Sequence, residues 1–444
     1  MKRIRIGLWA CLLIPTLLWA LTQSLPASPW TWFSTRPAVL QLTGILAILT
    51  MSAAMVLALR PKPLEALFDG LDKMYRLHRW LGISALVLSL LHWWWAQGTK
   101  WMVGWGWLER PARHGAGAPP DNALEQWFRS QRGLAEDVGE WAFYAAAALI
   151  VVALLRRIPY RWFAWSHRWI SVAFLVLVFH SVVLLRFQDW GQPIGWLVAA
   201  ALATGSVAAL IALSRRIGAS RRVHGRIETL QWYPGLQVLE TSIRLAPGWP
   251  GHRAGQFAFV TSQPKEGAHP YTIASAWDTS NPQITFITKS LGDHTRTLHD
   301  RLKPGMEVTV EGPYGRFDFE DDKPRQIWIG AGIGITPFVA RMKRRAHARD
   351  ARRIDLFHPT RDTDPAALAK LEADAQAAGV TLHLLVSPRD GRLDAQRIRT
   401  AVPDWRQASL WFCGPAAFGE SLERDFVSAG LAPADFHREL FEMR

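Results

Sequence analysis

The sequence predicts a helical membrane domain followed by two soluble domains, first an antiparallel β-barrel and then an α/β domain with a parallel sheet. Long apolar runs fill the chain up to about residue 213, and most acidic residues, strand-like alternation and glycine-rich turns come after them. Because this change in composition occurs once along the 444 residues, we expect a membrane part before a soluble part. The expected domains are 1–216, 217–322 and 323–444.

The membrane domain is predicted from the length of its apolar runs. A helix needs roughly 20 apolar residues to cross about 30 Å of hydrocarbon. Six runs approach this length, near residues 7–23, 38–59, 80–97, 140–155, 168–185 and 194–213. The first run also fits a secretory signal peptide, whose removal would leave five spans, but we expect it to be retained. The prediction is therefore a bundle of six helices in the lipid bilayer.

Positive charge predicts the orientation of this bundle. Lys and Arg gather before the first run and after the second, fourth and sixth, which places them all on one side of the membrane. The positive-inside rule then assigns both termini and the soluble domains to the cytoplasm. We expect a multi-pass protein of a bacterial-type inner or plasma membrane, with an external loop over 98–138 whose sequence is too irregular to interpret.

Net charge and cysteine content exclude several classes of protein. The formal charge is +14, but many of the cations lie at the ends of apolar runs, where membrane topology explains them. We therefore expect no nucleic-acid partner. Only Cys11 and Cys413 are present, which excludes a disulfide framework and an iron–sulfur cluster held by thiolates.

Four histidines lie in or beside two of the apolar runs: His78 and His92 at the third, His167 and His180 at the fifth. Ionisable residues inside a membrane are functional by default. Neutral imidazole is a good axial ligand of haem iron, and one imidazole from each of two helices fills both axial positions. Two facing pairs would hold two b-type haems roughly 20 Å apart. The alternative is that a neighbouring helix satisfies each histidine singly.

The spacing of these histidines fits one helix better than the other. Fourteen residues of an ideal helix leave His78 and His92 about 40° apart, so they share a face. Thirteen residues leave His167 and His180 about 140° apart. The second helix therefore requires either a tightened or widened turn or a different ring approach at each haem.

The first soluble domain carries two candidate flavin motifs. Segments such as GQFAFVTS, ITFITKS and MEVTVEG, separated by Pro and Gly turns, predict an antiparallel barrel. In HPYTIASA, Tyr271 can lie against a flavin ring with Thr272 at the ring edge, although both are also common in ordinary strands. LGDHT is a glycine turn before a helical stretch from Thr295 to Leu302, and its amides would hold a pyrophosphate or simply cap a helix. The candidates are His269, Pro270, Tyr271, Thr272, Ser275, Gly292, Asp293, His294 and Thr295.

The second soluble domain carries a candidate dinucleotide motif. QIWIGAGIGITPF reads as an apolar strand, a glycine-rich turn and a helix start, and the helix amino end favours an anion. Strand signals at IDLFHP, TLHLLVS and SLWFCGP alternate with helical stretches, which indicates a parallel sheet. Just past IDLFHP, Arg361 can meet the 2′-phosphate of NADPH, so we favour NADPH over NADH. The candidates are Gly330, Gly332, Gly334, Thr336, Pro337 and Arg361.

The four histidines together with HPYTIASA, LGDHT, EGPYGRF, GAGIGITPF and FCGP resemble the ferric reductase and NADPH oxidase superfamily over nearly the entire chain. The carboxyl half is similar to ferredoxin-NADP reductases. The resemblance implies that Tyr271 and Thr272 contact the isoalloxazine of FAD, that His269 and the Gly292–Thr295 turn serve its phosphates, and that Gly332–Thr336 bind NAD(P)H. It also implies roles beside the nicotinamide for Cys413, Gly414, Pro415 and a near-terminal aromatic, with Phe441 the candidate and Phe436 the second choice.

Two departures from the superfamily bear on the electron acceptor. Members that reduce dioxygen carry an arginine in the second helix and a histidine four residues after the outer haem ligand. Here no arginine lies between Pro37 and Leu59, and Ala96 follows His92 by four residues. We therefore expect an oxidoreductase that passes electrons from cytosolic NAD(P)H through FAD and two haems to an external one-electron acceptor, with ferric chelate preferred over dioxygen or quinone. The alternatives are a superoxide-producing oxidase, a haem-free membrane-anchored flavin reductase, and a non-enzymatic membrane adaptor or transporter.

Overall fold

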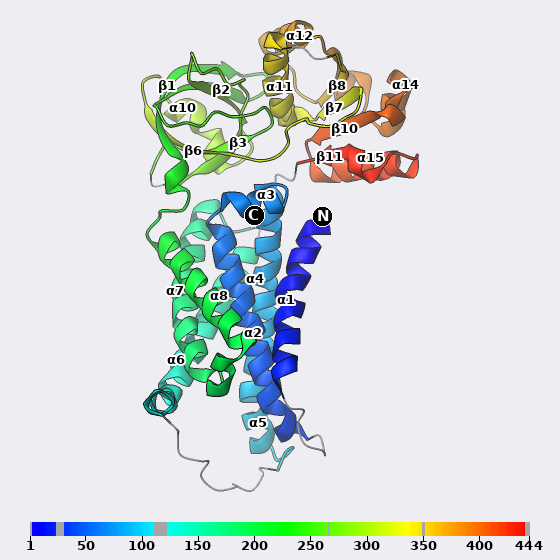
Figure 1. The fold of residues 1–444 in the computed structure, drawn as a ribbon. Helices are drawn as coiled ribbons and strands as arrows, with labels where there is room; N and C mark the ends of the chain where they lie inside the picture. The colour runs from blue at the N-terminus through cyan, green and yellow to red at the C-terminus, as the bar shows by residue number, and fades with distance from the viewer. Residues whose placement is uncertain are drawn as a thin grey trace. The chain divides into compact units, whose positions relative to one another are not determined.

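The structure is a computed structural model that describes residues 2–23, 31–109, 122–155, 157–264, 266–348 and 351–439. Its contacts divide the chain into two compact units, one up to Ile217 and one from Gly218 onward. Figure 1 shows helices in the first unit, and strands with covering helices in the second. Each unit is described by itself.

The first unit is built from long helices. They are α1 (Lys2–Thr22), α2 (Trp32–Ala58), α4 (Leu71–Trp93), α6 (Ala123–Leu154), α7 (Tyr160–Leu184) and α8 (Pro193–Leu213), with the short α3 (Lys62–Leu67) and α5 (Thr99–Gly104) between them. A π-helical turn, η1 (Trp94–Gly98), continues α4, and a 3₁₀ turn, η2 (Phe187–Gly191), precedes α8.

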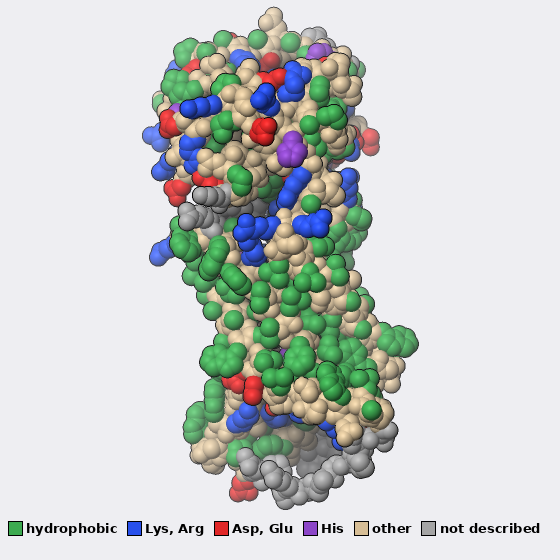
Figure 2. Space-filling model, turned by 90° about the vertical axis from the view of Figure 1, so that its left-hand side faces the viewer, with side chains coloured by type: hydrophobic (Ala, Val, Ile, Leu, Met, Phe, Trp, Pro, Cys, Tyr) green, Lys and Arg blue, Asp and Glu red, His purple; other side chains and the backbone are tan. Residues whose placement is uncertain are grey.

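Among the described helices, α1, α2, α6, α7 and α8 are long and apolar enough to cross a membrane. The third predicted span is present as α4 but does not meet this criterion, because its first turns carry Asp72, Lys73, Arg76 and Arg79. Hydrophobic side chains gather over much of the surface of this unit (Figure 2). Such a surface suits contact with lipid rather than water.

Most of the long helices begin earlier than their apolar runs, and at α2 and α6 this changes an expectation. The N-cap of α2 is Thr31, whose hydroxyl accepts from the Ser34 amide at 3.2 Å while the Ser34 hydroxyl accepts from the Thr31 amide at 2.9 Å. Arg36 therefore lies on the second helix, where the sequence analysis had placed no arginine. The N-cap of α6 is Asn122, so much of the expected loop 98–138 is helix. The cause is that charged residues paired at i,i+4, such as Arg129 with Glu125, extend α6 beyond its apolar part.

The helices pack around a shared apolar core in which α2 is the most buried of the five candidate spans. Phe174 of α7 is fully buried there. Gly205 of α8 makes room for it, since a methyl group at residue 205 would lie 2.7 Å from the Phe174 ring. Close approach of α7 and α8 thus depends on a small residue, as is common between helices in membranes.

The second unit starts with an antiparallel sheet, as predicted. Its strands are β1 (Arg222–Tyr233), β2 (Val238–Leu245), β3 (Phe257–Thr261), β4 (His269–Thr272), β5 (Gln283–Lys289) and β6 (Glu307–Tyr314), in the order β4-β3-β6-β1-β2-β5. An isolated bridge between Ile273 and Phe286 links the segment after β4 with β5. The predicted helical stretch after LGDHT is two single turns, α9 (Asp293–Arg296) and α10 (Leu298–Arg301).

A parallel sheet with helices follows, also as predicted. The strands are β7 (Arg325–Gly330), β8 (Arg353–Thr360), β9 (Thr381–Val386), β10 (Ala408–Cys413) and β11 (Phe436–Arg438), in the order β11-β10-β7-β8-β9. The helices are α11 (Thr336–His347), α12 (Pro365–Ala378), α13 (Ser387–Asp390), α14 (Ala395–Ala401) and α15 (Ala416–Ser428). Strand order reverses between β7 and β10, where α/β sheets bind their ligands.

Candidate functional site

The first unit brings the four histidines together as two facing pairs. The rings of His78 on α4 and His167 on α7 lie 5.9 Å apart between centroids, at 66°. The rings of His92 and His180 lie 6.2 Å apart, at 82°. Fourteen residues separate the two pairs along α4, which is about 21 Å of helix. Each pair joins the same two helices at a different depth.

Hydrogen bonds fix the tautomer of three of the four histidines. Nδ1 of His78 donates to the Ala54 carbonyl at 2.9 Å, Nδ1 of His92 to Leu40 at 3.0 Å, and Nδ1 of His180 to Ala135 at 2.7 Å. Because a carbonyl only accepts, these bonds place the proton on Nδ1 and leave the Nε2 lone pair available. Orientation of the ligating imidazole by its second nitrogen is the usual arrangement in metal sites.

The fourth histidine is held differently. Within the described residues, Nδ1 of His167 is buried and has no hydrogen-bond partner. Its ring stacks on Phe163, one turn earlier on α7, with centroids 5.1 Å apart. An imidazole buried in this way needs a partner for its nitrogens, which a bound metal would provide for one of them.

The ring separations suit one shared metal ion in each pair. Two metal–imidazole bonds of about 2 Å require nitrogens about 4 Å apart, and each ring centroid lies about 1.2 Å behind its nitrogen, so about 6.4 Å between centroids is needed. The observed 5.9 and 6.2 Å are close to this value. Bis-imidazole ligation of haem iron fits the side chains present.

Glycines make room for the pair at His92 and His180. A methyl group at Gly139 of α6 would lie 2.6 Å from both Cγ and Cε1 of His180, and one at Gly44 of α2 would lie 3.2 Å from Cε1 of His92. The His180 ring therefore lies directly over Gly139, where it reaches the Ala135 carbonyl. The sequence analysis missed both glycines, although small residues in apolar helices are a recognisable signal of close approach.

The unequal histidine spacing does not come from a distorted helix. From Tyr160 to Leu184, α7 is α-helical throughout, and the π-helical turn lies instead in η1, just after His92. Of the two options left open by the sequence, a different ring approach at each pair accounts for the structure. His180 reaches toward α6, whereas His167 rests on Phe163.

In the second unit, the candidate flavin residues meet in a hydrogen-bonded cluster. Nε2 of His294 lies 2.8 Å from the Tyr271 hydroxyl, and Nδ1 of His294 lies 2.6 Å from Glu266. Arg301 pairs with the other Glu266 oxygen at 2.6 Å. The His269 ring stacks on His294 with centroids 3.6 Å apart and planes 7° apart. HPYTIASA and LGDHT are thereby joined through His294. Glu266, which the sequence analysis did not single out, holds His294 and Arg301.

Burial and neighbouring charge set the protonation of this cluster. Burial, together with the nearby His294, lowers the pKa of His269 to about 4, and burial also lowers the pKa of His294. Burial raises the pKa of Tyr271. Burial alone would raise the pKa of Glu266, but its bonds to Arg301 and His294 lower it overall. At neutral pH the cluster therefore has neutral imidazoles beside one carboxylate–guanidinium pair.

One atom each of Glu266, His269 and His294 lie within 4.8 Å of one another, as in a metal site. The two imidazoles are stacked nearly parallel, however, so their in-plane lone pairs do not converge on one point. This geometry therefore does not suit one shared metal ion.

The remaining flavin candidates lie nearby. Pro270 and Thr272 are on β4, opposite Phe259 and Phe257 of β3. Ser275 is buried, and its hydroxyl accepts from the Thr285 amide at 3.1 Å. Gly292 caps α9 and Asp293 opens it. The Thr295 hydroxyl accepts from the Leu291 and Gly292 amides at 3.0 and 3.1 Å, so a pyrophosphate at these amides would replace the hydroxyl.

The glycine turn after β7 meets the FCGP segment after β10. The Ala331 amide donates to the Cys413 carbonyl at 2.9 Å. A methyl group at Gly334 would lie 2.6 Å from the Cys413 carbonyl carbon, and one at Gly414 would lie 2.8 Å from Cβ of Ala331. Gly334 thus serves close packing of the two motifs. Gly332 has φ +56° and open space around it, so it is the conformation that requires glycine there.

Most of the other nucleotide candidates are buried, namely Gly330, Thr336, Pro337 and Cys413, whereas Pro415 is exposed. A methyl group at Gly330 would lie 2.9 Å from Cα of Ile335, and Thr336 is buried with its hydroxyl bonded to the Ile333 carbonyl at 2.8 Å. Pro337 is in the first turn of α11, and Pro415 precedes α15. Burial raises the pKa of the Cys413 thiol. Phe436 is in the apolar core, and Phe441 lies outside the described residues.

A cavity opens beside the glycine turn, between the two sheets of the second unit. Its lining includes Tyr233, Glu240 and Lys289 from the antiparallel sheet and Gly332, Lys343, Thr360 and Asp362 from the other side. Lys289 donates to Asp362 at 2.9 Å. Arg361, between Thr360 and Asp362, is exposed. His358, which the sequence analysis missed, donates from Nδ1 to the Gly330 carbonyl at 2.6 Å and so fixes the end of β7.

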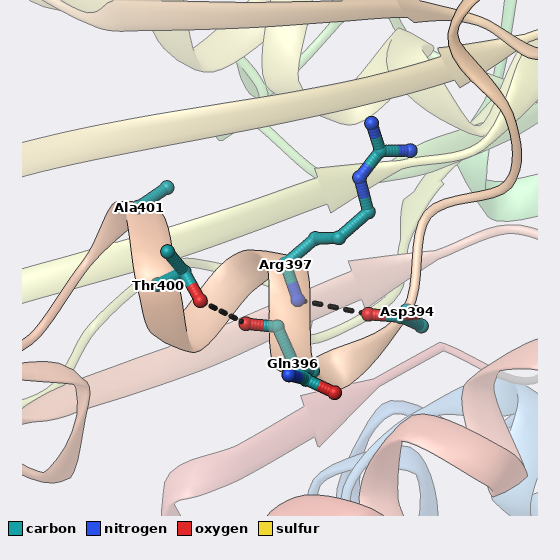
Figure 3. Close-up of a pocket in the computed structure, with 5 residues that line it drawn as sticks. All are labelled: Asp394, Gln396, Arg397, Thr400 and Ala401. Atoms are coloured by element: carbon teal, nitrogen blue, oxygen red, sulfur yellow. Dashed lines mark hydrogen bonds between the residues drawn. The ribbon is translucent and has the colours of Figure 1, made fainter.

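A shallow hollow on α14 contains none of the candidate residues (Figure 3). Asp394 accepts from the Arg397 amide at 2.8 Å, and the Thr400 hydroxyl donates to the Gln396 carbonyl at 3.0 Å. These are the internal bonds of a capped helix, and they explain this group of polar residues without a ligand.

Comparison with known proteins agrees with both units. Residues 43–178 match the model of a ferric reductase like transmembrane component, and residues 224–318 match that of an FAD-binding domain. The first match contains His78, His92 and His167 and ends two residues before His180. The second contains both flavin motifs.

Individual relatives match part of the chain. An NADPH oxidoreductase of Mycobacterium tuberculosis is 29% identical over 245 residues, which cover 52% of this chain and 62% of the relative. The ferredoxin–NAD(+) reductase component of an alkene monooxygenase system from Xanthobacter autotrophicus is 25% identical over 192 residues, 41% of this chain and 58% of the relative. The chain thus spans less than two thirds of these relatives. An Amycolatopsis cytochrome P450 reductase structure has 23% identity and a TM-score of 0.44, covering 50% of this chain and 70% of that chain.

The two family matches and the fold agree on the order of the domains along the chain. Apolar helices form a multi-pass membrane region, and an antiparallel FAD-type domain and a parallel-sheet domain follow it. The chain therefore has the ferric reductase and NADPH oxidase architecture, in which a ferric reductase-like transmembrane component is joined to a flavin-dependent reductase module.

Proposed function

We propose that the protein passes electrons from cytosolic NAD(P)H, through FAD and two b-type haems, to a one-electron acceptor on the opposite side of the membrane, with ferric chelate as the preferred acceptor. The observation that carries this proposal is the presence of two facing histidine pairs, at two depths of one bundle, with ring separations of 5.9 and 6.2 Å. Single histidines satisfied by neighbouring helices would not face one another twice.

Each part of the chain has a defined task in this proposal. Bound FAD supplies the conversion of a hydride into single electrons, and the haems supply one-electron transfer. Tyr271 and the His294–Glu266 cluster bind and orient the flavin. The glycine turn at Gly332 and the FCGP segment at Cys413 hold the nicotinamide coenzyme. The backbone carbonyls of Ala54, Leu40 and Ala135 orient the haem ligands and keep their Nε2 atoms free of protons.

A reduced visible spectrum of the purified protein tests the haems. Sharp b-type bands at about two haems per flavin are expected from four histidine ligands. A yellow protein without these bands would instead support the membrane-anchored flavin reductase.

Replacement of one haem ligand tests the direction of the path. His92→Leu is expected to leave NAD(P)H oxidation with a soluble artificial acceptor intact and to stop reduction of ferric chelate across the membrane. The exposed His224 on β1 provides the control His224→Leu, which should change neither reaction. External reduction that continues at the original rate in His92→Leu would contradict the proposed path.

Dioxygen is a second candidate acceptor because of Arg36. The start of α2 at Trp32 puts this arginine on the second helix, where its Nε donates to the Trp95 carbonyl at 3.1 Å and its Nη2 to the Ala96 carbonyl at 3.2 Å. The absence of an arginine therefore no longer argues against an oxidase, whereas Ala96 still does. Comparison of ferric chelate with dioxygen as the electron sink, in proteoliposomes supplied with NADPH, separates the two.

A further inference from the structure

A polar cluster joins α4 and α6 beside the His92–His180 pair, and ligation of haem does not explain it. Nε1 of Trp93 donates to the Tyr144 hydroxyl at 3.1 Å, and that hydroxyl donates to Glu140 at 2.6 Å. Gln97 of η1 donates to the other Glu140 oxygen at 2.8 Å. We call Trp93, Gln97, Glu140 and Tyr144 the Glu140 cluster.

Glu140 lies within a candidate membrane span. It is fourteen residues from Leu154, which is about 21 Å along α6. Its neighbours face outward, since Trp141 is 75% exposed and Tyr144 39% exposed in the absence of lipid. Within the residues that the structure describes, Glu140 accepts hydrogen bonds from the neutral side chains of Gln97 and Tyr144, and it is not paired with a Lys or Arg. A carboxylate in such a place is costly, and intramembrane carboxylates typically mark proton paths.

The cluster adjoins both histidines of one pair. Trp93 follows His92 in the chain, and Glu140 follows Gly139, the residue over which the His180 ring lies. A hydrogen-bonded carboxyl group and a phenol therefore stand next to the place where, by the proposed function, electrons leave the bundle. Reduction of ferric chelate requires electrons but no protons, so it does not explain the presence of this cluster.

Aromatic rings surround the same point. The ring of Trp93 lies 5.8 Å from Phe143 at 24°, 6.2 Å from Tyr144 and 5.4 Å from Trp101. The flat faces of these rings suit a planar, lipid-soluble ring, and the Tyr144 hydroxyl and the Glu140 carboxyl suit its carbonyl oxygens.

We propose that the Glu140 cluster is the binding site of a lipid-soluble quinone, which is an electron acceptor of this chain in addition to ferric chelate. This inference rests on the proposed function for its electrons. A quinone takes two electrons, delivered one at a time, and two protons, and its two carbonyl groups become hydroxyls. Each of the two quinone oxygens takes one proton, and both protons come from water at the membrane surface by way of this cluster. Tyr144 gives its proton to a quinone oxygen and is protonated again through Glu140. One NAD(P)H, oxidised to NAD(P)+, supplies the two electrons of each quinol.

The test compares two acceptors in the full-length protein, loaded with flavin and haem in proteoliposomes. NADPH-driven reduction of a short-chain ubiquinone analogue and of ferric chelate is measured for the wild type, Tyr144→Phe and Glu140→Gln. Loss of a general acid lowers quinone reduction by about 100-fold or more, and ferric chelate reduction should stay within about twofold. Glu125→Gln, which alters a carboxylate on the same helix paired with Arg129, should leave both reactions unchanged.

Photolabelling with an azidoquinone provides a readout that does not need turnover. Label is expected in the peptides around Trp93–Gln97 and Trp141–Tyr144, and Tyr144→Phe should weaken it. Quinone reduction at the wild-type rate in both variants, label confined to other segments, or an equal fall in both acceptor reactions would overturn the quinone site. Missing haem bands together with no reduction of either acceptor would instead contradict the proposed function.

Discussion

Replacement of Gly139 by alanine tests whether the His180 ring is held where a haem needs it. The new methyl group would lie 2.6 Å from Cγ and Cε1 of the ring, inside the 3.0 Å below which real Cβ atoms are essentially not found. Because the helix backbone on one side is fixed, the ring has to move away from α6. The 2.7 Å bond from Nδ1 to the Ala135 carbonyl is then lost.

The loss of haem affinity can be estimated from the lost hydrogen bond between His180 and Ala135. A buried group left without its hydrogen bond costs about 1–3 kcal/mol, which corresponds to about 5- to 150-fold weaker binding of the haem at the His92–His180 pair. We expect haem content to fall from about two to about one per flavin, because the His78–His167 pair is distant and untouched. Transfer to the external acceptor should stop, while NADPH oxidation with a soluble acceptor continues.

The assay is haem and flavin content by absorbance, with electron transfer measured on the same preparation. Gly133→Ala on the same helix is the matched control, since a methyl group at residue 133 meets no atom within 4 Å and alanine favours helix by about 1 kcal/mol. Gly139→Ala protein that keeps both haems and full external reduction would refute the assignment of His180 as an oriented ligand.

Three further outcomes are expected in the second unit. Gly334→Ala places a methyl group 2.6 Å from the Cys413 backbone and should lower the free energy of unfolding by about 3 kcal/mol or more, measured by thermal unfolding. Gly332→Ala has open space but a positive φ, and this backbone strain should cost about 1–2 kcal/mol. Equal effects would contradict these roles. Arg361→Ala should raise KM for NADPH about 10-fold or more and leave KM for NADH unchanged, and a similar rise for both coenzymes would exclude a contact with the 2′-phosphate. Burial holds the pKa of His269 at about 4, whereas it is about 6.5 in the unfolded chain, so between these pH values the unfolded state binds more protons, and flavin-free protein should lose stability as pH falls from about 6.5 to about 4. His269→Gln should flatten the dependence of Tm on pH over this range. An unchanged slope would contradict this role of His269.

Local sequence patterns predicted much of the architecture. Apolar runs located the long helices, and alternation with glycine turns predicted the antiparallel and parallel sheets, because helix and strand periodicities depend on residues close together in the chain. The same patterns failed at helix ends. Polar turns extend α2 and α6 beyond their apolar parts. Arg36 therefore lies on a helix, and the predicted loop 98–138 is largely helical where it is described.

The sequence by itself determined which side chains are available to the candidate sites: four histidines near apolar runs, two flavin motifs and a glycine turn after a buried strand. Only the tertiary structure decided how they are used. The carbonyls of Ala54, Leu40 and Ala135, the space over Gly139, and the bonds of Glu266 and Glu140 all depend on contacts between elements far apart in sequence. The physical reason is that a hydrogen bond or a close approach depends on how helices and strands pack, which no local periodicity encodes.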